Sequence, residues 1–497
     1  MQRKTPILYN ALMLTGVNLL LRFLGTSFQV WLSGRIGAEG IGLLQLTLSV
    51  GNLAMVAGMA GIRTTAMYLT AGELGRRSPD HVIWVLYGCI RYSLVCSGTI
   101  ALLLSTFAPY LAEHWIGNCL TVLSLRLFAG FLPVSCLTGV MVGYFTAANR
   151  IGMLAAVEVA EQLFSMTVTV LFLHFWARGN SLQSCESVIL GSGLGSCLTL
   201  ICLVILRLKE HSPVGSRIPV FRPLASTAIP LGGADVLKSG INTLENLLVP
   251  KRLALHSGTN SPLAAFGILS GMVFPVLMFP SAILFALAEL LIPELARCHA
   301  SGSQGRIRYL VRRSLKISFL YGLIMGGILF LTAAELSDWF YRNSEAGTWL
   351  RYYSLMVPML YCDAVTDAMT KGLGKQKTCV RNNIITSGMD VSLLFLLLPR
   401  FGMAGYYASF LITHLINFLL SIHLLRKTTG QDMEIGKAAL ALIVASVAAM
   451  VCTNVPSPLP RTAAFLSLLI AGLTLTGVIG KEDMKWFATM TRVQKVR

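Results

Sequence analysis

Apolar residues fill fourteen long stretches of this chain, and short polar segments separate them. A run of about 20 apolar residues crosses a bilayer as a helix, because lipid offers the backbone no hydrogen bonds. The pattern therefore predicts an all-α membrane protein with fourteen transmembrane helices. The expected spans cover residues 6–33, 41–70, 82–108, 118–146, 151–176, 184–206, 224–250, 262–295, 314–333, 349–370, 379–398, 402–425, 436–453 and 462–480.

Composition leaves little room for a domain in water. Of 497 residues, 55% are hydrophobic and 12% are charged, whereas about 25% are charged in soluble domains. The eleven cysteines form no C-x-x-C pair and no Cys/His cluster at ligand spacing, so we expect neither a metal site nor a cofactor. No Walker loop or catalytic constellation appears, so we expect a protein that is not an enzyme.

Basic residues predict the orientation in the membrane. They concentrate in every second connection, around residues 76–77, 207–222, 297–316 and 371–381. Because basic loops stay in the cytoplasm, we expect both termini to be cytoplasmic. The net charge of +18 then reflects this bias and contact with anionic membrane lipids. The bases are dispersed over many loops, which argues against a nucleic-acid partner.

A spacing shared by two spans suggests an internal repeat. Arg126 precedes Pro133 by seven residues in the fourth span, and Arg351 precedes Pro358 by seven in the tenth. The longest cytoplasmic linkers include residues 207–223, and span ten is the fourth span after that linker. The match predicts two six-helix bundles, and six spans return the chain to the same side. The two bundles are therefore expected to be parallel repeats.

The expected domains follow from this division. They are a first bundle at 1–206, a cytoplasmic linker at 207–223, a second bundle at 224–425, and two additional helices with a cytoplasmic tail at 426–497. Prolines and glycines inside several spans predict bends, which alternating access requires. They include Pro133, Pro230, Gly232, Gly233, Pro275, Pro280 and Pro358.

Polar residues recur on one side of three spans. They are Asn18 and Arg22 in the first span, Asn52 and Arg63 in the second, and Asp235, Lys238, Asn242 and Glu245 in the seventh. A charge at the centre of a bilayer costs about 2.5–3.5 kcal/mol on insertion scales, so each needs water or a partner. The stripes predict a water-filled substrate cavity between the bundles.

Structural pairing is the alternative for these residues. Arg22 could pair with Glu245, or Lys238 with Asp235, simply to hold helices together. The same choice stays open for Asp363, Asp367 and Asp390, which could bind a coupling ion or could form hydrogen bonds between helices.

Three sequence blocks resemble the stage V sporulation protein B group of the multidrug/oligosaccharidyl-lipid/polysaccharide (MOP) exporter superfamily. The first runs from Asn18 to Gly25 and continues from Gly34 to Leu46. The second is Asn246–Leu253 with Leu269–Met272, Pro275 and Pro280, and the third is Lys371–Lys377. Together they extend in patches over residues 10–425.

The resemblance implies a flippase for a lipid-linked saccharide of the cell envelope, which in spore formers is a precursor of cortex peptidoglycan. It also implies two bundles that rock around a central cavity, and a lipid-accessible groove at the last two helices. The chain departs from the pattern in one place. Lipid II flippases carry an arginine early in span eight, but the stretch Phe266–Met272 has no base.

The sequence leaves three function classes to compare. A flippase for an undecaprenyl-pyrophosphate saccharide needs bases such as Arg22, Arg63 and Lys238 to neutralise the head group. A cation-coupled multidrug exporter needs carboxylates, yet residues 1–38 contain no Asp or Glu. A membrane scaffold leaves the polar stripes unexplained. The sequence favours the lipid-linked substrate.

The orientation can be tested by cysteine labelling in intact cells. Cysteines introduced at Ser257 and Ser344 should react with an impermeant reagent, because they lie in connections expected outside the membrane. A cysteine at Ser303 should react only after permeabilisation. The reverse pattern would overturn the orientation.

Overall fold

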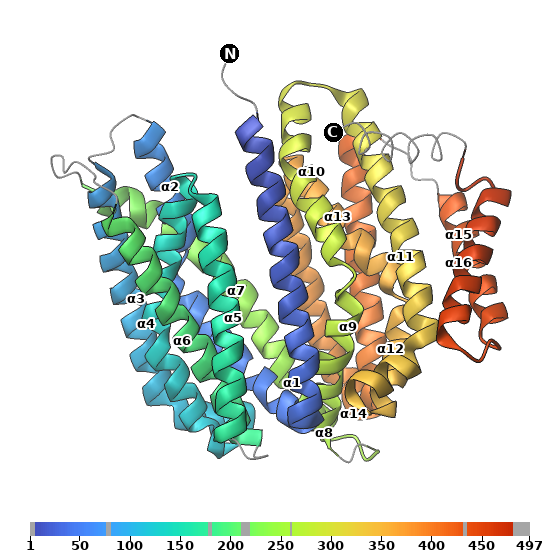
Figure 1. Ribbon diagram of the computed structural model, residues 1–497, viewed down its shortest axis with the longest axis horizontal. Coiled ribbons are helices and arrows are strands. Elements are labelled where there is room, and N and C mark those ends of the chain that lie inside the picture. The colour runs from blue at the N-terminus through green and yellow to red at the C-terminus, as the bar shows by residue number, and fades with distance from the viewer. Residues whose placement is uncertain are drawn as a thin grey trace. The chain divides into compact units, whose positions relative to one another are not determined.

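The computed structural model describes residues 5–75, 81–176, 181–209, 219–258, 261–430 and 435–480, and every regular element in them is helical. Residues 210–218 of the expected linker and the expected tail, residues 481–497, lie outside the described residues. The α-helices (Figure 1) are α1 (Thr5–Met59), α2 (Ile62–Gly75), α3 (Val82–Tyr110), α4 (Val122–Ala147), α5 (Ile151–Phe175), α6 (Ser181–Leu208), α7 (Phe221–Leu253), α8 (Pro262–Gly267), α9 (Phe274–Met278), α10 (Ala282–Ala300), α11 (Gln304–Tyr341), α12 (Ser344–Ser354), α13 (Val357–Gly372), α14 (Gln376–Thr429), α15 (Ile435–Cys452) and α16 (Pro458–Leu475).

All fourteen expected spans fall on helices, which confirms the all-α membrane fold. In the described residues, eight helical segments are long and apolar enough to cross a bilayer, or nine if the bent pair 262–278 and 282–299 is one span. Two of the eight, 16–74 and 376–429, hold two expected spans each. The remaining expected spans are the charged α7, the broken pair α12–α13 and the short α15.

Glycine, more than proline, interrupts the helices. α1 breaks at Gly37, where φ is +80°, and α14 breaks at Gly402, where φ is +57°. Both are conformations that side chains with a Cβ rarely adopt. Neither Pro133 nor Pro230 ends its helix, because α4 and α7 continue through them. Near Pro358 and Pro280 the expected interruptions do occur, since α13 starts at Val357 and α9 stops at Met278.

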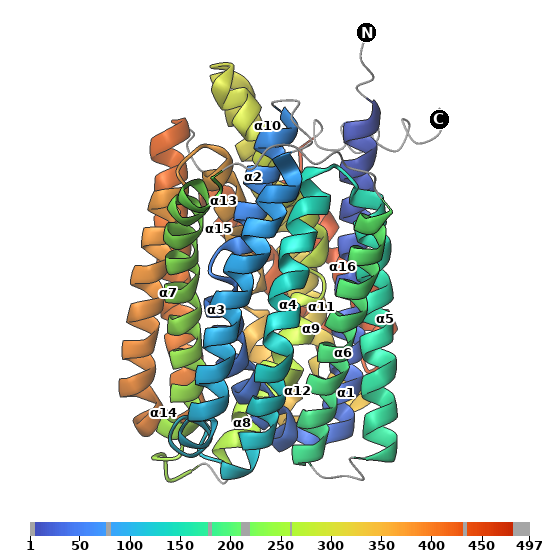
Figure 2. The ribbon, with the colours of Figure 1, turned by 90° about the vertical axis from the view of Figure 1, so that its left-hand side faces the viewer.

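Unit 1, residues 1–272 and 387–406, is one of two compact units. In it α3, α4, α5 and α6 run side by side, as both ribbon views show (Figures 1 and 2). A buried apolar cluster that includes Val140, Phe145 and Leu203 fills the space among these helices. Small residues allow close approach, because a Cβ on Gly143 of α4 would lie 2.5 Å from the Arg63 carbonyl oxygen of α2.

Unit 2, residues 273–386 and 407–497, has α11 packed against α10, α12, α13, α15 and α16. The fully buried Phe465 of α16 lies over Gly327 of α11. Arg461 of α16 donates to the Leu331 carbonyl and to Glu335 Oε1, each at 2.7 Å. α16 is therefore bound to α11 by an apolar contact and a polar one.

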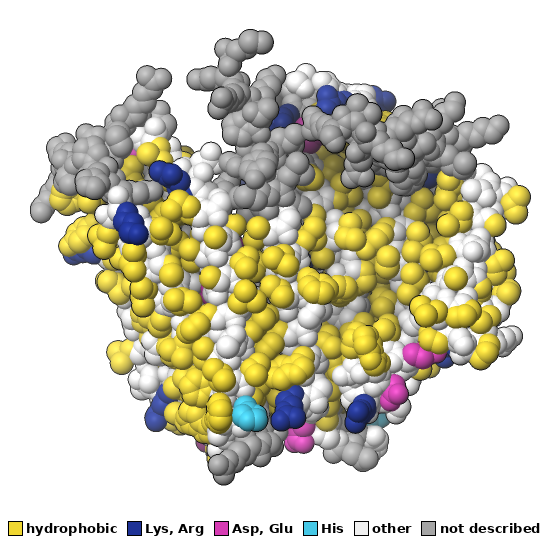
Figure 3. All heavy atoms as spheres, viewed as in Figure 1, with side chains coloured by type: hydrophobic (Ala, Val, Ile, Leu, Met, Phe, Trp, Pro, Cys, Tyr) yellow, Lys and Arg dark blue, Asp and Glu magenta, His cyan; other side chains and the backbone are white. Residues whose placement is uncertain are grey.

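The two compact units group helices by packing, whereas the expected bundles rest on a sequence repeat. The division at 1–206 and 224–425 therefore stays a prediction. The surface in Figure 3 agrees with a membrane environment, because hydrophobic side chains cover much of the helices and Lys, Arg, Asp and Glu gather toward their ends. The chain is a multi-pass membrane protein.

Replacing Phe465 with Ala should loosen the C-terminal helices from α11. The substitution removes a buried ring that faces a glycine, so we expect a loss of about 3–5 kcal/mol and a lower unfolding temperature. Thermal unfolding of the purified protein measures this. Leu468→Ala, on the same helix but 44% exposed, is the matched control and should change little. Equal losses in both variants would refute the packing.

Candidate functional site

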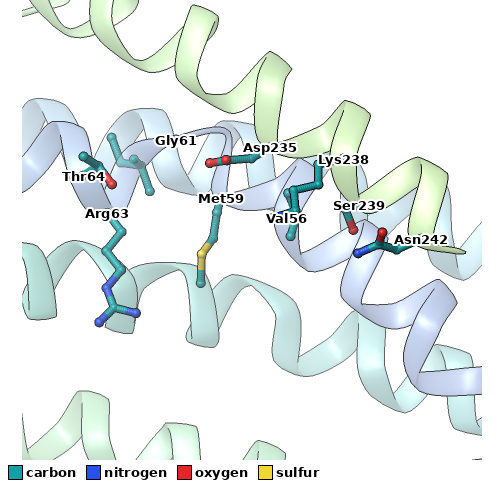
Figure 4. Close-up of a pocket in the computed structure, with 10 residues that line it drawn as sticks. Val56, Met59, Gly61, Arg63, Thr64, Asp235, Lys238, Ser239 and Asn242 are labelled. Carbon is teal, nitrogen blue, oxygen red and sulfur yellow. The ribbon is translucent and has the colours of Figure 1, made fainter. Parts of the chain in front are cut away.

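An open pocket of about 380 Å³ lies in unit 1, where α1, α2 and α7 meet (Figure 4). Val56 and Met59 of α1 and Ile62 of α2 form its apolar part. Its polar lining consists of Arg63, Thr64, Asp235, Lys238, Ser239 and Asn242. The pocket therefore combines residues of the expected second and seventh spans.

A helix break shapes this pocket. Ala60 and Gly61 have φ values of +42° and +73°, and they separate α1 from α2. Gly232 of α7 lets the two backbones touch there, because a Cβ on Gly232 would lie 2.6 Å from the Ala60 carbonyl carbon. The first N–H groups of α2 have no acceptor inside the helix. The N-terminus of α2 therefore places a partial positive charge beside the pocket.

Arg63 faces away from the α7 side of the pocket. In Figure 4 its guanidinium group points away from Asp235, Ser239 and Asn242. It interacts electrostatically with Glu158 of α5. Arg63, Asp235 and Lys238 are all exposed at their positions, so each charge is accessible to solvent or to a ligand.

The structure brings four of the eight predicted site residues together. Arg63, Asp235, Lys238 and Asn242 line the pocket. The other four are not in its lining: Arg22 and Asn52 are exposed on α1, Asn18 is partly buried on α1, and Glu245 is partly buried on α7. That Arg22, Arg63 and Lys238 share one solvated cavity stays a prediction.

Hydrogen bonds hold α7 against α1 next to the pocket. Thr243 Oγ1 donates to the Ser49 carbonyl oxygen at 3.0 Å, and Asn246 Nδ2 donates to Ser49 Oγ at 2.9 Å. Both α7 residues lie within a turn or so of Asn242. The polar side of α7 therefore has two roles, since residues 243–246 bind α1 and residues 235–242 line the pocket.

Glu245 belongs to a different cluster from the one expected. Its carboxyl group shares a side-chain hydrogen bond with Asp390 of α14, and Tyr406 lies within electrostatic reach of both. Asp390 and Tyr406 are 8% and 6% exposed. Two carboxyl groups can share a hydrogen bond only if one of them carries a proton. Spacing along the chain gave no signal for this pair, which joins residues far apart in sequence.

Two acids on α5, Glu158 and Glu161, have the same alternatives from the sequence as Asp363, namely ion coupling or hydrogen bonds between helices. Glu161 accepts a hydrogen bond of 2.7 Å from Thr199 of α6, so it has a partner between helices. Glu158, less than one turn earlier, instead interacts with Arg63. In the described residues, no group of three or more His, Cys, Asp or Glu is arranged to hold a metal ion.

The stretch that lacks the flippase arginine is a packing surface. Phe266 and Leu269 are buried, and Gly267 and Gly271 lie directly against Ala38 and Ile41 of α1. A long basic side chain at either glycine would displace α1. This stretch therefore supplies contact between helices rather than a binding group.

The comparisons with known proteins agree with this fold. No family profile matches the chain. Stage V sporulation protein B of Bacillus subtilis (strain 168) is 22% identical over 457 residues, which cover 89% of this chain and 88% of that protein. The resemblance to the stage V sporulation protein B group is thereby confirmed.

Solved structures share the architecture. An inward-facing multidrug resistance MATE family transporter of the MOP superfamily matches with a TM-score of 0.69 and 14% identity, over 84% of this chain and 100% of that one. The lipid II flippase MurJ in an inward closed conformation matches with a TM-score of 0.69 and 12% identity, over 94% of this chain and 99% of that one. The chain has the fold of MOP transporters and flippases, which are not enzymes.

The shared proton predicts different effects for two substitutions of Glu245. Glu245→Gln should leave the unfolding temperature nearly unchanged, because the amide can donate to Asp390 in place of the proton. Glu245→Ala should lower it, because a buried Asp390 loses its partner at a cost of about 1–3 kcal/mol. Thermal unfolding of both purified variants measures the difference. If Gln were as damaging as Ala, the carboxyl groups would not share a proton.

Proposed function

We propose that this protein moves a lipid-linked saccharide across the membrane, with an undecaprenyl-pyrophosphate head group bound at the pocket of unit 1. The single observation that carries the proposal is the pocket itself, which presents Arg63 and Lys238 beside the start of α2 in the membrane-spanning part of the chain. Movement by alternating access is part of the proposal, as is an envelope polysaccharide as the final product.

The charges in the pocket favour an anion. In the lining, Arg63 and Lys238 contribute two positive charges and Asp235 one negative charge, while Glu158 lies outside the lining on the Arg63 side; the N-terminal end of α2 adds a partial positive charge. Coulomb attraction strengthens several-fold where apolar walls lower the dielectric constant. Guanidinium binds two phosphate oxygens at once, whereas ammonium acts as a point charge, so the two bases would recognise a pyrophosphate differently.

The size of the pocket suits a head group and not a whole lipid. Its volume of about 380 Å³ lies near the lower end of ligand sites, which span roughly 300–1,000 Å³. A pyrophosphate with part of its first sugar would fill such a space, while the polyprenyl chain would remain in lipid. We infer peptidoglycan of the spore cortex as the destination, on the basis of the sporulation relative.

A multidrug exporter of the same fold is the second candidate. The observation in its favour is Asp235, an exposed carboxylate in the same pocket, which could attract a cationic drug. Deleting the protein separates the candidates. Accumulation of a lipid-linked precursor on the cytoplasmic side supports the flippase, whereas drug sensitivity with normal precursor levels supports the exporter.

Removing the positive charge of a pocket base should slow transport. Arg63→Ala and Lys238→Ala should each slow flipping at least tenfold in reconstituted vesicles, since losing a hydrogen bond to a charged group costs about 1.5–3 kcal/mol. Arg63→Lys should retain part of the rate. The same order is expected at Arg22, with Arg22→Lys above Arg22→Gln and Arg22→Ala.

Arg91→Ala is the matched control for these variants. Arg91 is exposed on α3, and its guanidinium lies 5.8 Å from the ring centre of Tyr87, outside the pocket lining. Its removal should leave flipping intact. Protein abundance must be measured beside the rate, because an intramembrane arginine can also hold helices together. Normal flipping at normal abundance in Arg63→Ala and Lys238→Ala would refute the anion site.

A further inference from the structure

The polar side chains on the pocket side of α7 are not used to hold helices together. Asp235, Lys238, Ser239 and Asn242 line the pocket, and in the described part of the chain none of their side chains forms a hydrogen bond or an ion pair with another residue. Asp235, Lys238 and Asn242 are exposed, and Ser239 is partly exposed. The pairing of Lys238 with Asp235 that the sequence allowed therefore does not form among the described residues.

The next turn of α7 shows the opposite arrangement, in which polar residues serve packing. Thr243 Oγ1 donates to the Ser49 carbonyl oxygen, and Asn246 Nδ2 donates to Ser49 Oγ. Thr243 is only 3% exposed. A polar group in a membrane span is costly unless a partner, water or a ligand meets it. The pocket side of α7 therefore carries groups that are available to a ligand.

The pocket has two chemically different sides. On the α2 side, Arg63 and the first N–H groups of the helix supply positive charge and donors. On the α7 side, the Asp235 carboxylate is directed toward Met59, and Ser239 and Asn242 follow along the same side of the helix (Figure 4). The Arg63 guanidinium points away from these α7 residues. A ligand that meets both sides must therefore carry two kinds of group.

The row on α7 suits neutral donors and not a second anion. Asp235, Ser239 and Asn242 lie at i, i+4 and i+7, so they extend over about 10 Å along one side of the helix. A carboxylate only accepts hydrogen bonds, whereas a hydroxyl and an amide both accept and donate. A pyrophosphate is repelled by the charge of Asp235. Sugar hydroxyls, in contrast, are uncharged donors and acceptors that follow one another around a ring.

We propose that Asp235, Ser239 and Asn242 form a saccharide subsite, which binds hydroxyl groups of the sugar attached directly to the pyrophosphate. The inference rests on the proposed function, because Arg63 and Lys238 hold the pyrophosphate next to this subsite. Hydrogen bonds from hydroxyls to the ionised Asp235 are charge-assisted and therefore stronger than those between neutral groups. Val56 and Met59 of α1 offer apolar surface to the C–H groups of the ring.

Lys238 makes a sugar a better occupant than a cation on this side of the pocket. It lies three residues from Asp235 and next to Ser239 on α7, so a cation at Asp235 would meet its positive charge. A hydroxyl carries no charge and meets no such repulsion. Asp235 also discriminates among anions, because a phosphate without a sugar brings no donor to satisfy the carboxylate. The subsite therefore favours a sugar-linked pyrophosphate over a free one.

Equilibrium binding of UDP-glucose and of UDP to the purified full chain in lipid nanodiscs tests the subsite. The two probes share a diphosphate and differ in the hexose. The wild type should bind UDP-glucose about tenfold more tightly than UDP, which is the effect of one hydrogen bond to a charged group. Asp235→Ala should abolish this preference and should tighten the binding of UDP, because a repelling carboxylate is removed. Asp235→Asn should keep part of the preference, since its amide oxygen still accepts.

Ser226→Ala is the matched control on the same helix. Ser226 is exposed outside the pocket lining, and its hydroxyl donates to the Pro223 carbonyl oxygen at 3.0 Å, so both affinities should stay unchanged. Asn242→Ala keeps the test decisive if Asp235→Ala does not fold, and it should also reduce the preference. Equal binding of UDP and UDP-glucose by the wild type would overturn the subsite. A preference that survives in both Asp235→Ala and Asn242→Ala would do the same.

Arg63→Ala separates these outcomes from a failure of the proposed function. It should weaken the binding of both probes by the same factor and leave the preference for the hexose. If Arg63→Ala changed neither affinity, the anion site would be wrong, and the subsite with it. Tetraphenylphosphonium serves as a drug-like cation. If Asp235→Ala abolished its binding and left the preference for the hexose, Asp235 would belong to a cation site and the proposal would be refuted.

Discussion

Backbone hydrogen bonding in hydrocarbon is the constraint on which this structure depends. Lipid cannot satisfy a free carbonyl, so each helix break inside the membrane needs a side chain to replace the lost bond. At the break between α1 and α2, the Tyr92 hydroxyl donates to the Ala60 carbonyl at 3.4 Å. At the turn of α14 between the expected spans 379–398 and 402–425, His256 Nδ1 likewise lies 3.3 Å from the Pro399 carbonyl and acts as its donor.

The break between α9 and α10 follows the same rule in unit 2. Tyr361 donates to the Leu277 carbonyl and Tyr321 to the Pro280 carbonyl, each at 2.8 Å. The two rings stack with centroids 6.0 Å apart, so the two hydroxyls are held as a pair. Aromatic residues with one polar atom can serve an interrupted helix because their rings remain in apolar surroundings. These breaks are built features of the fold.

The break between α1 and α2 also determines where polar side chains are accessible. The interruption at Ala60–Gly61 turns the start of α2 toward α7, and this places Arg63 and Lys238 on one pocket. Had α1 continued into α2, the positions of residues 62–64 would have been rotated and their N–H groups would have been used inside the helix. A helical break and a basic pocket are thus one structural feature in unit 1.

Hydropathy and charge were sufficient to predict the fold class, because the length of a span depends only on the thickness of the bilayer. The breaks were harder to predict. Pro133 and Pro230 lie inside continuous helices, since neighbouring groups can compensate for one missing N–H. The break at Ala60–Gly61 depends on the close approach of Gly232, a tertiary contact that local sequence does not report.

The partners of polar residues on distant helices could not be predicted from the sequence either. Asp235, Lys238 and Asn242 line one pocket, and helical periodicity alone places them on one side of span seven. The same periodicity put Glu245 with them, whereas its partner Asp390 comes from α14. A helix face is a local property, but the choice of neighbour along that face is set by the whole packing arrangement.

The exposed charged side chains bear on whether the protein can accept an anionic or a cationic substrate. Within the spans, Arg22, Arg63 and Lys238 are exposed, and Asp235 is the exposed acid beside them. Several other acids of the described spans are engaged in contacts: Glu245 with Asp390, Glu161 with Thr199, and Asp363 with Asn417. A cationic substrate finds one accessible carboxylate in the pocket, Asp235, whereas an anionic head group finds two accessible bases there, Arg63 and Lys238. This excess of accessible positive charge is the physical basis for proposing an anionic, pyrophosphate-linked substrate rather than a drug cation.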